Sequence, residues 1–79
     1  MATTLERVKN ITAELLKIDA AIIETDSRFV EDLGAESIQS IELVAAFDEE
    51  FDIEMDEDEA LAVKTVGDAV TFIDRYLAR

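Results

Sequence analysis

Apolar residues recur at helical spacing along the first part of the chain. Thr3 and Glu6 have the spacing of a capping box and predict a helix that begins near Thr3 or Thr4. The helix should end near Lys17 or Ile18. Its inward stripe is made of aliphatic residues at helical intervals: Leu5, Val8, Ile11, Leu15 and Leu16. This pattern is typical of an amphipathic helix with one buried face.

A second helix, predicted from Glu36 or Ser37 to Phe51, carries apolar residues on two sides. They form two stripes displaced around the axis: Leu43, Val44, Phe47 and Phe51 in the first, and Ile38, Ile41 and Ala45 in the second. The first stripe is enough to reach a core. The second stripe indicates either additional burial or an apolar strip that faces a partner.

Two further helices are predicted in the last third of the chain. A short one fits Glu57 to Val63, and another begins after Thr65, which has Asp68 three residues later as a cap. The inward face of the last helix should contain five apolar residues: Val66, Ala69, Val70, Ile73 and Leu77. The fold class is therefore all-α, a small four-helix bundle of three longer helices and one short helix.

The segment between the first two helices, Ile18 to Ala35, is predicted to be a long loop. Its "ETDSRF" and "EDLG" stretches are rich in residues that hydrogen-bond their own backbone. A loop of this length in a small domain is usually functional or held by apolar anchors. Five residues could supply the anchors: Ile22, Ile23, Phe29, Val30 and Leu33.

Composition narrows the classes of function. The 79 residues are enough for one domain, residues 1–79, and 49% of them are hydrophobic. The absence of Cys and His excludes disulfides, thiolate or imidazole metal sites, Cys nucleophiles and His general bases. No apolar stretch is long enough to span a bilayer. We therefore expect a soluble, cytoplasmic protein, and we expect it to be monomeric.

The charge is strongly negative, −13 at pH 7, and no Lys or Arg occurs from Phe29 through Val63. Such a chain is repelled by phosphate backbones and anionic membranes, so nucleic-acid binding and membrane insertion are not expected. Partners should be proteins with basic patches, because electrostatic steering then favours encounter. The same self-repulsion predicts low stability at low ionic strength.

The acidic segment "DIEMDEDE" alternates carboxylates as an EF-hand loop does, but two required positions differ. Glu57 stands where the loop needs Gly, and Val63 stands where it needs a bidentate Glu. No metal site is therefore expected. The many carboxylates are better interpreted as a solvated face than as an acid–base pair. With no base partner for its serines, the chain is not expected to be an enzyme.

Ser37 and Ser40 stand at the start of the second predicted helix. From position alone Ser37 is best interpreted as an N-cap, because its oxygen can accept an otherwise unpaired N–H. Ser40, one turn further along, is interpreted as a helix-surface residue.

The stretch "DLGAESIQSIELVAAFDEEFDIEMDEDEALAVKTVGDAVTFI" resembles the acyl carrier proteins of fatty-acid and polyketide synthesis. The resemblance extends over nearly the whole chain. It implies that a separate Mg²⁺-dependent transferase esterifies Ser37 with 4′-phosphopantetheine from coenzyme A. The acyl group is then carried as a thioester on the thiol of that arm. This fits a chain that has no Cys to hold a thioester and no base to activate a serine.

The resemblance also implies roles for two sets of residues. Positions that dock onto basic patches of acyl-processing enzymes correspond to Glu36, Ile38, Ile41, Glu42, Ala45, Asp48 and Glu49. Positions around an acyl-binding pocket correspond to Phe29, Leu43, Phe47, Val63 and Ala69.

Several residues differ from the usual family pattern, and they leave both a housekeeping and a specialised carrier open. Glu36, Ile38 and Gln39 replace the usual Asp, Leu and Asp, and Phe47 stands where Leu is common. The "GAES" stretch argues against a peptidyl carrier. The alternative function is an unmodified acidic helical adaptor that binds basic protein surfaces.

Overall fold

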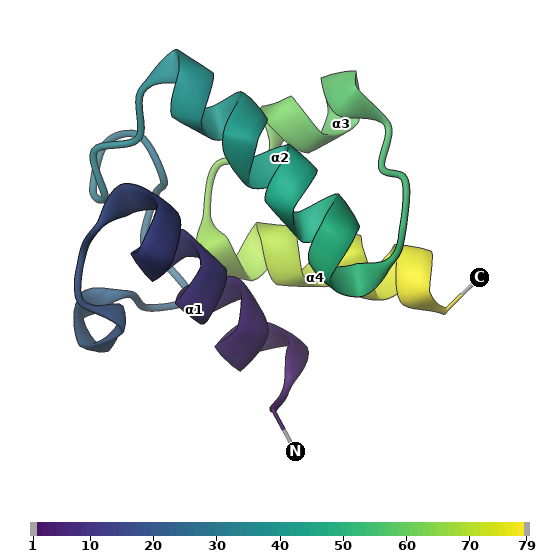
Figure 1. Cartoon of the computed structure of the whole chain (residues 1–79), viewed down its shortest axis with the longest axis horizontal. Helices are drawn as coiled ribbons and strands as arrows, with labels where there is room; N and C mark the ends of the chain where they lie inside the picture. Colours follow the sequence, from purple (N-terminus) through teal and green to yellow (C-terminus); the bar gives the residue numbers. More distant parts are fainter. Residues whose placement is uncertain (1, 79) are drawn as a thin grey trace.

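Four α-helices pack around a common core in the computed structural model, which describes residues 2–78 (Figure 1). In chain order the helices are α1 (Thr4–Leu16), α2 (Ser37–Phe51), α3 (Glu57–Ala62) and α4 (Val66–Leu77). A short 3₁₀ turn, η1 (Ala20–Ile22), lies in the long connection between α1 and α2. The prediction of an all-α bundle with three longer helices and one short one is confirmed.

Local capping sets where α1 begins and ends. The Thr3 hydroxyl accepts the Glu6 backbone N–H at 3.1 Å, and the Glu6 carboxylate accepts the Thr3 N–H at 3.2 Å, which completes the predicted capping box. The helix ends at Leu16 because Lys17 adopts a left-handed conformation with φ of 58°. The observed end is thus one or two residues earlier than predicted.

The other helix boundaries agree closely with those predicted from the sequence, with one correction. The Thr65 hydroxyl accepts the Asp68 N–H at 3.1 Å, so the predicted cap of α4 is confirmed. Helix α3 ends at Ala62, one residue before the predicted end, because Val63 is extended.

The core is formed mainly by one side of each helix and by three residues of the long loop, Ile23, Phe29 and Ala35. Helix α1 packs against α2 and α4, and α3 packs against α2. The buried apolar residues are Val8, Ile23, Phe29, Ala35, Leu43, Phe47, Phe51, Met55, Ala60, Val66, Ala69 and Ile73. The first predicted stripe of the second helix is therefore the side that faces the core.

One residue of the predicted core is wrong, because Leu77, at the end of α4, is 45% exposed. The predicted stripe of α1 faces the core: Val8 is buried, and Leu5, Ile11, Leu15 and Leu16 are half-buried and pack against it. Thr12, which the sequence did not indicate, is buried beside them. The Thr12 hydroxyl donates to the Val8 carbonyl at 2.8 Å, so its polar group is satisfied inside the core.

The long loop is held by fewer apolar anchors than predicted. Ile23 and Phe29 are buried and Leu33 is half-buried, but Ile22 and Val30 are 60% and 55% exposed. Ile22 and Ile23 are adjacent at the end of η1, where successive side chains point about a third of a turn apart. The turn therefore directs only one of them to the core.

Backbone hydrogen bonds tie this loop to the connection between α3 and α4. The Phe29 N–H donates to the Lys64 carbonyl at 3.0 Å, and the Val66 N–H donates to the Ser27 carbonyl at 3.0 Å. The Gly67 N–H approaches the Thr25 carbonyl to 2.7 Å. A Cβ at Gly67 would lie 3.0 Å from that carbonyl oxygen, so glycine permits the close approach.

An exposed ion pair fixes the turn at residues 28–32. The Arg28 guanidinium donates to the Asp32 carboxylate at 3.2 Å, and this hydrogen bond lowers the pKa of Asp32 below its ordinary value. Because the pKa of Asp32 is lower in the folded state, the pair stabilises the fold at pH values above the ordinary aspartate pKa. That stabilisation is lost as the pH falls through the lowered value. Because both groups are exposed, the contribution is small.

The negative charge predicts that salt stabilises the fold. Within residues 2–78 the ion pairs are Arg7–Glu50, Arg28–Glu31 and Arg28–Asp32, which leave most carboxylates unpaired at a net charge of −13. Raising NaCl from about 10 mM to about 150 mM screens this repulsion and should raise the melting temperature by about 4 °C or more. Thermal unfolding followed by circular dichroism measures it. An unchanged melting temperature would show that self-repulsion is not important.

Candidate functional site

Ser37 is the first residue of α2, and Glu36 is its N-cap. Glu36 is extended, with φ of −85° and ψ of 166°, and its carbonyl accepts the Ser40 N–H at 2.9 Å. The Glu36 N–H donates to the Gln39 side chain at 2.9 Å. The interpretation of Ser37 as the N-cap is therefore wrong, because the helical backbone already begins at Ser37.

The Ser37 side chain is exposed, and among the described residues its hydroxyl has no hydrogen-bond partner. The first N–H groups of a helix have no acceptor within the helix, and the helix dipole is positive at this end. A phosphate group on the Ser37 oxygen would therefore lie beside favourable backbone donors, although the Glu36 carboxylate opposes it in part. The hydroxyl is available for modification at no cost to an existing hydrogen bond.

The second apolar stripe of α2 lies on the surface. Ile38 is 67% exposed, Ile41 is 49% exposed and Ala45 is exposed. The carboxylates beside them are exposed as well: Glu36, Glu42 and Glu49. The spacing of Ile38, Ile41, Glu42, Ala45 and Glu49 brings these side chains to one face of the helix, which we name the outer face of α2. Glu36 precedes this face as the N-cap. The alternative of additional burial is thus excluded.

Asp48 differs from the other residues predicted for partner binding. It is half-buried, and its carboxylate accepts the Met55 backbone N–H at 3.1 Å. This bond holds the connection between α2 and α3. Asp48 therefore has a structural contact that its position in the helical pattern did not reveal.

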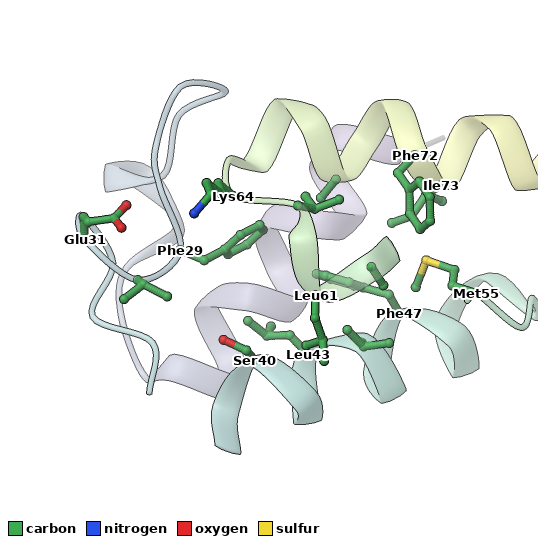
Figure 2. Close-up of a pocket in the computed structure, with 15 residues that line it drawn as sticks. Phe29, Glu31, Ser40, Leu43, Phe47, Met55, Leu61, Lys64, Phe72 and Ile73 are labelled. Carbon is green, nitrogen blue, oxygen red and sulfur yellow. The ribbon is translucent and has the colours of Figure 1, made fainter. Parts of the chain in front are cut away.

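A partly open cavity of about 120 Å³ lies between α2, α3, α4 and the loop at Phe29 (Figure 2). All five residues predicted for an acyl pocket line it: Phe29, Leu43, Phe47, Val63 and Ala69. The lining also includes Met55 and Phe72, which the sequence analysis did not assign to a pocket. Phe72 stands three residues after Ala69, so the helical period could have indicated it. Met55 lies between helices, where no period applies.

Ser40 lies at the edge of this cavity. Its side chain is half-buried, lines the cavity and donates to the Glu36 carbonyl at 3.3 Å. Ser40 is thus not a plain helix-surface residue. It is one turn of α2 after Ser37, so this edge of the cavity lies close to the exposed serine.

No three acidic side chains among residues 2–78 are grouped so that they could hold a metal ion. None of the helices in this range is long and apolar enough to cross a membrane.

Comparison with known proteins decides the family. The phosphopantetheine attachment site family matches residues 6–73 of the chain. The chain belongs to this family. A solved structure from Mycobacterium tuberculosis, described as "a putative acyl carrier protein", superposes with a TM-score of 0.87 at 28% sequence identity. That match covers 94% of this chain and 99% of the other.

The resemblance to acyl carrier proteins is therefore confirmed. The prosthetic group of a phosphopantetheine-attachment protein is 4′-phosphopantetheine. Its thiol can form a thioester, which the chain itself cannot do because it has no Cys. The start of α2 fits such a group, because it combines a helix N-terminus with an exposed serine hydroxyl that has no hydrogen-bond partner within residues 2–78. Acyl carrier proteins are carriers rather than catalysts.

Proposed function

We propose that this protein carries acyl intermediates as thioesters on a 4′-phosphopantetheine arm esterified to Ser37. The observation that carries the proposal is the exposed Ser37 hydroxyl at the first position of α2, which has no hydrogen-bond partner in the described part of the chain. A half-open apolar cavity one turn away supports acyl groups as the cargo. The pathway is proposed to be fatty-acid synthesis or a related lipid or polyketide synthesis.

The attachment is tested by intact mass spectrometry. The protein is incubated with coenzyme A, Mg²⁺ and a phosphopantetheinyl transferase, and the mass should increase by one phosphopantetheine group. Omission of coenzyme A is the control. No mass increase with several transferases would contradict the proposal and favour an unmodified acidic adaptor.

The outer face of α2 is proposed to dock onto the transferase and onto acyl-processing enzymes. Its exposed carboxylates would attract a basic patch from a distance, and Ile38 and Ile41 would fit against apolar surface on contact. The role of the charges is mainly in the association rate, which should therefore depend on salt.

Reversing two charges on this face should slow transfer. We expect the combined variant Glu42→Lys and Glu49→Lys to lower kcat/KM of the transferase for the protein by about tenfold or more at low salt. The matched control is Glu24→Lys with Asp26→Lys, which changes the net charge equally at exposed positions outside α2. Initial rates at several salt concentrations measure the effect. Equal loss in both variants would show that net charge matters rather than this face.

A further inference from the structure

The size of the cavity limits the cargo. An engineered apolar cavity of about 150 Å³ holds benzene, which corresponds to roughly 25 Å³ for each carbon. By the same ratio, the cavity of about 120 Å³ holds about five carbons. A longer chain would leave methylene groups in water or require the helices to separate.

The cavity is elongated along α2. On α2 the lining residues follow one another at helical spacing from Ser40 through Leu43 and Val44 to Phe47, a length of roughly 10 Å along the axis. Met55 and Phe72 lie at the opposite end from Ser40 (Figure 2). A chain that enters beside Ser40 therefore meets aromatic and thioether side chains at the far end.

Contacts around this end hold it in place. The Phe72 ring packs edge-on against Tyr76 with centroids 5.2 Å apart. The Tyr76 hydroxyl accepts the Asp56 N–H at 2.9 Å, and the Asp48 carboxylate accepts the Met55 N–H at 3.1 Å. These bonds join the start of α3 and its preceding segment to α4 and α2. The end of the cavity is therefore a wall that these contacts tie to α2 and α4.

We propose that this carrier shelters short acyl chains of about five carbons, and that Phe47, Met55 and Phe72 set this limit. The proposal rests on the proposed attachment at Ser37 and adds the class of cargo. Chains up to the limit bury each methylene in the cavity. Chains beyond the limit gain no further burial.

The test loads the protein with acyl-phosphopantetheine from acetyl-, butanoyl-, hexanoyl-, octanoyl- and dodecanoyl-coenzyme A. The melting temperature should rise by about 3 °C or more for each methylene from acetyl to butanoyl. It should stay constant from hexanoyl onward. Nuclear Overhauser effects should connect the terminal methyl of the butanoyl chain to Met55 and Phe72. A rise that continues to dodecanoyl, or no dependence on length, would overturn the limit.

Two variants test the far wall. Phe47→Leu enlarges the cavity and should move the plateau to longer chains by about one carbon or more. Phe51→Leu is the matched control, because Phe51 is buried on the same helix but does not line the cavity. It should lower every melting temperature without moving the plateau. If Phe47→Leu fails to fold, Phe72→Leu, which is half-buried, serves the same purpose. A plateau that moves equally in the control, or in neither wall variant, contradicts the proposal.

Loading is scored separately from the length dependence. Intact mass shows whether the acyl-phosphopantetheine group is attached before any melting curve is recorded. No attachment with any of the five thioesters would contradict the proposed function. Attachment without the predicted plateau would contradict only the limit on cargo length.

Discussion

Ser37→Ala is expected to abolish phosphopantetheine attachment completely and to leave the fold unchanged. The substitution removes the proposed nucleophilic oxygen, so no product should form at any transferase concentration. The hydroxyl makes no hydrogen bond among the described residues and the side chain is exposed, so the free energy of unfolding should change by about 0.5 kcal/mol or less. Intact mass after transferase treatment and a urea unfolding curve measure the two effects.

Ser40→Ala is the matched control for this experiment. Ser40 lies one turn further along α2, and its hydroxyl donates to the Glu36 carbonyl at 3.3 Å. This variant should gain the full mass of one phosphopantetheine group. A mass increase in Ser37→Ala would show that the group is not attached to Ser37. A complete loss of the mass increase in Ser40→Ala would likewise contradict attachment at Ser37.

Ile23→Ala is expected to destabilise the fold strongly through the long loop. Ile23 is fully buried, and truncating a buried aliphatic side chain to alanine costs about 2–5 kcal/mol. A domain of this size has a free energy of unfolding of roughly 4–12 kcal/mol, so the variant should lose a large part of it. Urea unfolding monitored by circular dichroism measures the change.

The neighbouring residue provides the control. Ile22 is 60% exposed, so Ile22→Ala should change the free energy of unfolding by about 0.5 kcal/mol or less. The pair compares identical chemistry at adjacent positions of the same turn. Equal effects of the two substitutions would show that the loop is not held through Ile23.

The helices could be predicted from the sequence because their signals are local. The capping box at Thr3 and the cap at Thr65 both form as their spacing indicated. The prediction failed for residues whose burial is decided by tertiary contacts. Ile22 and Val30 look like anchors by composition, but the course of the chain leaves them exposed. Thr12 is polar, yet it is buried because its hydroxyl bonds to the preceding turn.

The candidate site was predicted only in part, for the same reason. Helical spacing separated the two stripes of α2 and assigned the first to the core, but it could not decide whether the second was buried as well. The packing of α1 and α3 against α2 leaves Ile38 and Ile41 exposed. The contact of Asp48 with the Met55 N–H joins two segments, so no periodic pattern contains it. The N-cap depends on backbone angles, and these place Glu36 rather than Ser37 at that position.

The central claim is that Ser37 carries the phosphopantetheine arm, and site mapping tests it most directly. The transferase-treated protein is digested, and the modified peptide is fragmented in a mass spectrometer. The chain has three serines, Ser27, Ser37 and Ser40. The account predicts that fragment ions place the whole added mass on Ser37. Placement of the group on Ser27 or Ser40, or an unmodified protein after treatment with several transferases, would contradict it.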